Sequence, residues 1–233
     1  MTKRIWELDA LRGICILGMV LVHLFYDLRV SGILEETALL SALLEWGGVV
    51  FLLLSGVCVT LGRHHVRRGL LVFLCGMLCT AVTAGMYFLG MAGKGMIIYF
   101  GVLHCLGICM LLWGLFSRLP TWLLGVLGAV FTILGLTYVQ ETLLDIPWLL
   151  PLGFMFPGFV TSDYFPLLPN LGFFLLGAVL GRILYRSKAT LLPRVDPRWL
   201  PLRFLCLCGR QSLWIYLLHQ PILTGILAIS ELF

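Results

Sequence analysis

The sequence predicts an all-α, polytopic membrane protein, and three observations support this fold class. The chain of 233 residues is 61% hydrophobic and only 12% charged, whereas a soluble domain is about 25% charged. Its apolar runs continue over helix lengths, without the alternation that is typical of a membrane β-barrel. Its basic residues gather in every second connection between these runs. This composition excludes a soluble globular enzyme, a disordered chain and a disulfide-rich secreted module.

Seven segments are predicted to span the bilayer, because a span needs about 20 apolar residues. They are expected at residues 11–28, 39–61, 69–91, 97–116, 121–139, 167–184 and 212–233. Before the sixth span, the apolar stretch 146–166 is interrupted by prolines, which break helices. It is therefore predicted to be re-entrant or interfacial. The glycines of the sixth span predict close helix packing; they are Gly172, Gly177 and Gly181. The whole chain, 1–233, is expected to form one transmembrane domain.

The distribution of basic residues orients these spans. With the N-terminus in the cytosol, all of the 16 basic residues except Arg29 and Lys94 fall on the cytosolic side, as the positive-inside rule favours. We therefore expect the C-terminus outside, the loops 62–69 and 185–210 in the cytosol, and the loop 140–166 outside. The net charge of +5 is explained by this orientation, so no nucleic-acid partner is expected. The cytosolic set is Lys3, Arg4, Arg12, Arg63, Arg67, Arg68, Arg118, Arg182, Arg186, Lys188, Arg194, Arg198, Arg203 and Arg210.

Three ionisable residues share one face of the first predicted span. Arg12 and His23 are eleven residues apart, a rotation of about 1100° that ends roughly 20° from its start, and Asp27 lies one helical turn further. Ionisable groups inside a bilayer are costly and are candidates for function. The alternatives are that Arg12 extends to the lipid headgroups and that His23 is a hydrogen-bonded packing residue. His104 and His219 lie in later predicted spans, where a single histidine is more often a packing residue.

The order of the motifs resembles that of a family of membrane acyltransferases. The motif Leu8-Asp-Ala-Leu-Arg-Gly13, followed by His23, is similar to the first helix of acyltransferase-three type enzymes. It also resembles the heparan-α-glucosaminide N-acetyltransferase catalytic domain, most closely in its small bacterial relatives, over nearly the whole chain. The other motifs that carry the resemblance are His23-Leu-Phe-Tyr-Asp27, Phe51-Leu-Leu-Leu-Ser-Gly56, Arg67-Arg-Gly69, Gly101-Val-Leu-His104, Asp163-Tyr-Phe-Pro166 and Ser212-Leu-Trp-Ile-Tyr-Leu-Leu-His-Gln-Pro221.

This resemblance implies acyl transfer across a bacterial cytoplasmic (inner) membrane. The implied donor is cytosolic acetyl-CoA or another acyl-CoA, and the implied acceptor is an amine or hydroxyl of an extracytoplasmic glycan or a related small molecule. The family's essential histidine falls on His23 and its motif arginine on Arg12. The predicted spans are fewer than in the characterised branches, and no extracytoplasmic domain is expected, so the acceptor stays open.

The residue chemistry agrees with this implied reaction. A neutral imidazole at His23 suits a general base or a nucleophile, and Asp27 is expected to orient its ring. His104 and His219 are further catalytic candidates. Guanidinium groups bind phosphate in two-point contacts, so four arginines are candidates for binding CoA: Arg12, Arg63, Arg67 and Arg68.

Other partners follow from the same interpretation. Asp163 and Tyr164, in the predicted outside loop, are expected on the acceptor side. No metal is expected, because Cys206 and Cys208 lack a second ligand pair at zinc spacing. The expected partners are the lipid bilayer, the CoA thioester and the acceptor, and a homo-oligomer is left open.

Two other functions remain open from the sequence. A proton-coupled transporter or carrier would use the intramembrane histidine, aspartate and arginine side chains as a proton relay, although no internal duplication of the kind found in many transporters is present. A structural or assembly subunit would use the same residues to join helices. Binding of CoA separates these functions, because only the acyltransferase requires it.

Overall fold

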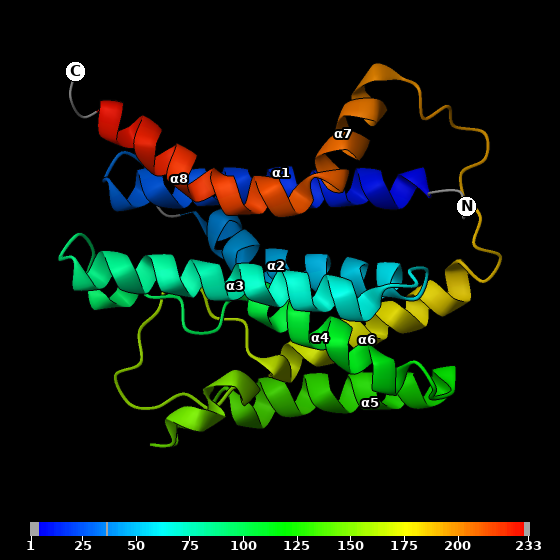
Figure 1. Ribbon diagram of the computed structural model, residues 1–233, viewed down its shortest axis with the longest axis horizontal. Coiled ribbons are helices and arrows are strands. Elements are labelled where there is room, and N and C mark those ends of the chain that lie inside the picture. Colours follow the sequence, from blue (N-terminus) through cyan, green and yellow to red (C-terminus); the bar gives the residue numbers. More distant parts are fainter. Residues whose placement is uncertain (1–4, 36, 231–233) are drawn as a thin grey trace. The chain divides into compact units, whose positions relative to one another are not determined.

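A computed structural model describes residues 5–35 and 37–230, and Figure 1 shows how its helices follow one another along the chain. Lys3 and Arg4 of the predicted cytosolic set, and residues 231–233 of the predicted last span, lie outside these ranges. The α-helices of the described residues are α1 (Trp6–Val30), α2 (Ala38–Val59), α3 (His65–Phe88), α4 (Val102–Phe116), α5 (Thr121–Leu134), α6 (Leu167–Leu184), α7 (Leu200–Arg210) and α8 (Ser212–Ser230). Short turns complete them: η1 (Lys94–Met96), η2 (Gly135–Val139) and η3 (Pro147–Leu152).

The described helices have the length and composition of membrane spans. Five are long and apolar enough to cross a bilayer, namely α1, α2, α3, α5 with η2, and α6, while α4 and α8 are apolar but shorter. Their apolar side chains remain exposed on the outer surface: Leu70, Leu74 and Leu78 of α3 are each more than half exposed. A repeated exposed apolar side chain at every fourth position suits lipid and not water. The predicted all-α, polytopic membrane fold is confirmed.

Helix α4 begins five residues later than the predicted span at 97–116. The residues before it run in extended conformation, where Phe100 forms a β-bridge with Tyr164. The N–H of Phe165 donates to the carbonyl oxygen of Phe100 at 2.9 Å. Hydropathy alone cannot see this pairing, because it joins segments that are far apart in the sequence.

The stretch 146–166 is irregular, as its prolines predicted. It contains the single 3₁₀ segment η3, and just before it Leu143 forms an isolated bridge with Met155. The N–H of Leu144 donates to the carbonyl oxygen of Met155 at 2.9 Å.

The predicted loop 185–210 contains a helix at its end, α7. Side chains that α7 turns inward recur at helical spacing, and the exposed positions Arg203, Phe204 and Leu207 lie between them. The inward positions are Leu202, Leu205, Cys206 and Gly209. Pro201 lies in the first turn, where proline needs no hydrogen-bond donor. The spacing was therefore available in the sequence, and the many charges and prolines concealed it.

The helices form two compact units, and the boundary between them lies inside α2. Unit 1 comprises residues 1–54 and 187–233, and unit 2 comprises residues 55–186. In unit 2, α3 packs on α4, and α6 packs on both α4 and α5. The close packing predicted from the glycines of α6 is confirmed at two positions: a β-carbon at Gly172 would collide with Thr132 of α5, and one at Gly181 with Val57 of α2.

In unit 1, α1 packs against both α7 and α8, with α7 meeting its first half and α8 lying beside its second half (Figure 1). A β-carbon at Gly13 would overlap the carbonyl oxygen of Leu205, and one at Gly209 would overlap the carbonyl oxygen of Asp9. The backbones of α1 and α7 are therefore in direct contact. Small residues permit such contact between helices in lipid, where dispersion and hydrogen bonds replace the hydrophobic effect.

This contact predicts different effects for two glycines of α1. Gly13→Ala forces the backbone of α7 to move, and overpacking of this kind costs about 1–3 kcal/mol. Gly18→Ala is the matched control, because nothing lies within 4 Å of its β-carbon position, and it should be neutral or stabilising. The measurement is the Tm of each purified chain in the same detergent. A Gly13→Ala chain that melts no lower than Gly18→Ala would contradict the direct backbone contact.

Candidate active site

Two of the predicted site histidines meet inside unit 1. His23 of α1 and His219 of α8 have ring centroids 4.8 Å apart, with an angle of 83° between the ring planes. This is an edge-to-face arrangement, which aromatic rings favour. His219 is 9% exposed and His23 is half-buried. The sequence suggested both residues separately, and the structure brings them together.

Backbone hydrogen bonds select the tautomer of both rings. Nδ1 of His23 lies 3.0 Å from the carbonyl oxygen of Met19, and Nδ1 of His219 lies against that of Tyr216. A carbonyl oxygen only accepts, so each Nδ1 carries a proton and, in the neutral ring, each Nε2 carries a lone pair. Within residues 5–35 and 37–230, Nε2 of His219 is buried without a hydrogen-bond partner. The pair therefore presents two nitrogens that can accept a proton.

Asp27 lies one turn beyond His23 and is held by Gln220 of α8. The side-chain amide of Gln220 donates to both carboxylate oxygens of Asp27, at 3.2 and 3.0 Å. We expected Asp27 to orient the ring of His23, but Nδ1 of His23 instead donates to the carbonyl oxygen of Met19. Sequence analysis missed Gln220, although it directly follows His219 in the last of the shared motifs. Together these four side chains form the histidine cluster: His23, Asp27, His219 and Gln220.

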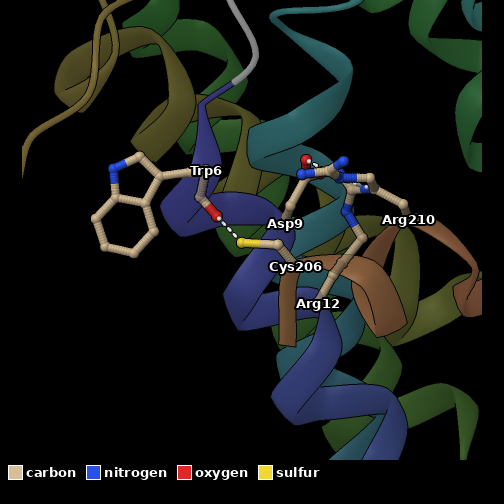
Figure 2. Close-up of polar contacts among 5 residues, drawn as sticks. All are labelled: Trp6, Asp9, Arg12, Cys206 and Arg210. Carbon is tan, nitrogen blue, oxygen red and sulfur yellow. Dashed lines mark hydrogen bonds and ion pairs between the residues drawn. The ribbon is translucent and has the colours of Figure 1, made fainter. Parts of the chain in front are cut away.

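Arg12 lies near the start of the same helix, about 16 Å from His23 along its axis at 1.5 Å per residue. Its Nη1 is 3.6 Å from Oδ1 of Asp9, and Nε of Arg210 is 3.5 Å from Oδ2 of Asp9. Figure 2 shows both guanidinium groups gathered around this carboxylate. Asp9 is buried at 6% exposure, so its charge requires such partners. Sequence analysis missed Asp9 and Arg210 as site residues, although Asp9 belongs to the same motif as Arg12.

The other predicted donor-binding arginines belong to unit 2. Arg63 lies in the turn before α3, and Arg67 and Arg68 lie in its first turn. All three are exposed. The N-terminal end of a helix carries partial positive charge, which adds to their attraction for an anion.

His104 is fully hydrogen-bonded within unit 2. Its Nδ1 accepts from the N–H of Gly101 at 3.2 Å, so its Nε2 carries the proton and donates to Oγ1 of Thr80 at 3.2 Å. The Thr80 hydroxyl in turn donates to the carbonyl oxygen of Ile98 at 2.7 Å. The ring is 2% exposed. This geometry favours the packing role that the sequence left open for His104.

Asp163 and Tyr164 are also engaged with their own unit. Oδ2 of Asp163 accepts from the N–H of Val102 at 3.2 Å, at the N-terminal end of α4, where a carboxylate is stabilised. The Tyr164 hydroxyl donates to the carbonyl oxygen of Leu150 at 2.8 Å, and burial raises the pKa of Tyr164. The first contact joins the irregular stretch to α4, and the second joins two parts of that stretch to each other. In the described part of the chain, no group of three or more His, Cys, Asp or Glu side chains is arranged to hold a metal ion.

Comparison with known proteins identifies a family. The model of a family described as heparan-alpha-glucosaminide N-acetyltransferase, catalytic, matches residues 4–221. No curated protein and no solved structure gives a match. The matched range contains the whole histidine cluster as well as Asp9, Arg12 and Arg210.

The hydrogen bonds of His104 predict a structural phenotype. His104→Ala leaves the N–H of Gly101 unpaired in a buried position, which costs about 1–3 kcal/mol of unfolding free energy. His104→Gln should recover part of this loss, because glutamine at this helical position can reach back to the same N–H. Thermal unfolding of the purified chain measures both, with the exposed His64→Ala as control. If His104→Ala unfolds at the wild-type temperature, the hydrogen bonds are not what retains this histidine.

Proposed function

Because the chain belongs to the heparan-alpha-glucosaminide N-acetyltransferase catalytic family, a family of membrane acyltransferases, we propose that it transfers an acetyl group from acetyl-CoA to an amine or hydroxyl acceptor. The observation that carries this proposal is the contact of His23 with His219, in which each ring keeps a proton-accepting nitrogen. Acyl transfer to an amine or hydroxyl needs such a base at the reacting centre. Arg12, on the same helix, supplies positive charge for the phosphates of the donor.

The proposed reaction begins at His23. The acceptor N–H or O–H loses its proton to Nε2 of His23 as its nitrogen or oxygen attacks the thioester carbonyl carbon. The carbon–sulfur bond then breaks, and the CoA thiolate takes the proton from the imidazolium. The Nδ1–H of His23 remains bonded to Met19 throughout, so the ring keeps its orientation during both proton transfers. No net proton is gained or lost by the protein in one cycle.

The other members of the histidine cluster support the cation that forms on His23. The ring of His219 packs edge-to-face against it, with centroids 4.8 Å apart, which holds in place the ring on which the cation forms. Asp27, one turn away on the same face, supplies a negative charge whose position Gln220 sets through two hydrogen bonds. We assign Asp27 and Gln220 as positioning residues and His23 as the base.

The proposed orientation follows from the charges. We place the N-terminus and the end of α1 that carries Arg12 in the cytosol of a bacterium, the C-terminus outside, and the whole chain in the inner membrane as one domain. CoA then approaches from the cytosol, and the acceptor, a glycan or related molecule, approaches from the other side. Arg63, Arg67 and Arg68 face the same cytosolic compartment in this arrangement.

His23→Ala should abolish transfer while CoA binding is retained, because it removes the proton acceptor and leaves the arginines in place. General base catalysis contributes about 10²–10⁴-fold, so hydrolysis of acetyl-CoA or transfer to an acceptor should fall by that order. Asp27→Asn should reduce the rate less, because the base remains. Both rates are measured on purified protein, together with CoA affinity by calorimetry.

The controls separate the proposed function from its rivals. Wild-type protein that does not bind CoA would favour the proton-coupled carrier, in which the same histidines relay protons. His23→Ala protein that binds CoA and turns over within a few-fold of wild type would remove His23 from the chemistry and leave His219 as the candidate base.

The orientation predicts which cysteine substitutions are accessible from outside the cell. Asp145 and Arg194 are both exposed and lie on opposite sides of the membrane in the proposed topology. In a background without reactive native cysteines, a membrane-impermeant maleimide should label Asp145→Cys in intact cells and Arg194→Cys only after lysis. The reverse pattern would invert the topology.

A further inference from the structure

Unit 1 contains a cavity of about 470 Å³ at the start of α1, where α7 crosses it. Small-molecule sites typically have volumes of about 300–1,000 Å³. Its walls come from α1, α7 and the segment before α7, and include Trp6, Asp9, Arg198, Arg203, Cys206 and Arg210. The histidine cluster does not line it.

The cavity is positively charged. Three arginines against one aspartate leave a formal charge of +2 on its walls. Arg203 and Arg210 are seven residues apart on α7, which is close to two turns, so they share one face about 10 Å apart along the axis. This spacing favours a ligand that carries more than one phosphate. Guanidinium groups bind phosphate oxygens in two-point, charge-assisted hydrogen bonds.

Two contacts hold the wall of the cavity in place. Asp9, buried at the backbone contact of α1 and α7, orients the guanidinium of Arg210 at 3.5 Å. The thiol of Cys206 donates to the carbonyl oxygen of Trp6 at 3.4 Å, as Figure 2 shows. Burial raises the pKa of Cys206, so this thiol stays neutral and adds no negative charge to the cavity.

We propose that this cavity binds the phosphorylated nucleotide end of the acyl-CoA donor, an assignment that rests on the proposed function. Its volume exceeds what one phosphate fills, and Trp6 offers an indole ring of the kind on which bases stack. From Asp9 to His23 is 14 residues, about 21 Å along α1. A nucleotide held at the start of α1 therefore leaves the long pantetheine arm to carry the thioester along the helix toward the histidine cluster.

The headgroup of an anionic phospholipid has the same phosphate chemistry. The indole wall and the cavity volume favour the nucleotide over this headgroup. The experiment therefore includes one arm for each source.

The test is calorimetry on the purified full chain in nanodiscs of neutral lipid, with adenosine 3′,5′-bisphosphate and CoA as probes. Arg203→Gln should weaken the binding of both probes about tenfold, the loss of one hydrogen bond to a charged group. The matched control is Arg194→Gln, which removes an exposed arginine of the same basic segment that does not line the cavity. It should change either affinity by less than about twofold, because Arg194 does not line the cavity and a charge outside the site is screened by salt.

Each other outcome overturns the assignment. Equal losses in the two variants indicate general attraction to the basic segment and not a site. CoA binding that is unchanged in Arg203→Gln places the donor phosphates elsewhere, and the proposed function survives. If the bisphosphate does not bind and Arg203→Gln instead lowers the retention of phosphatidylglycerol by the purified chain, the cavity is a lipid site.

The two proposals fail separately. In one case, the bisphosphate binds in a manner that depends on Arg203, but the wild-type protein neither hydrolyses acetyl-CoA nor transfers acetyl groups. The cavity is then a nucleotide site, and the proposed acyltransferase function is wrong. In the other case, the protein transfers acetyl groups, but Arg203→Gln does not change its affinity for CoA. The acyltransferase function then stands, and the assignment of the cavity as the nucleotide site is wrong.

Discussion

The direct contact between the backbones of α1 and α7 is the constraint on which the rest of unit 1 depends. Gly13 and Gly209 lie at the contact, where no side chain separates the two helices. Only Gln211 separates the end of α7 from the start of α8, so the position of α7 also sets where α8 begins along α1. His219 lies two turns into α8 and reaches His23 because of this path. A local contact between two glycines thus determines which side chains meet further along the same helix.

Buried acidic residues attach the basic segment to the same end of α1. Glu7, 6% exposed, accepts hydrogen bonds from the hydroxyl of Thr190 at 2.8 Å and from the N–H of Leu191 at 2.7 Å. Asp9 forms ion pairs with Arg12 and Arg210. Carboxylates are favoured in the first turn of a helix and need partners when buried. The acidic residues in the first turn of α1 therefore hold the basic segment and its arginines against this end of the helix. This explains why an acidic motif lies in the most basic part of the protein.

The sequence predicted those features that depend on composition and helical period. Hydropathy predicted the fold class and located most helices, and the spacing of Arg12, His23 and Asp27 placed them on one face of α1. The contacts of His219 with His23 and of Gln220 with Asp27 join residues nearly 200 positions apart, and no local pattern specifies which helices become neighbours. The hydrogen bonds of His104 were equally hidden, because they depend on Thr80 and on an extended segment that precedes α4.

The two imidazoles of the histidine cluster face their backbone carbonyls in the same way, with Nδ1 as donor. With both rings neutral, the pair therefore offers two proton-accepting nitrogens, while its two Nδ1–H groups are already engaged by the backbone. A molecule that meets such a pair can donate a hydrogen bond to it but cannot accept one from it. The backbone geometry of α1 and α8 thus favours a molecule that brings its own N–H or O–H group to these two nitrogens.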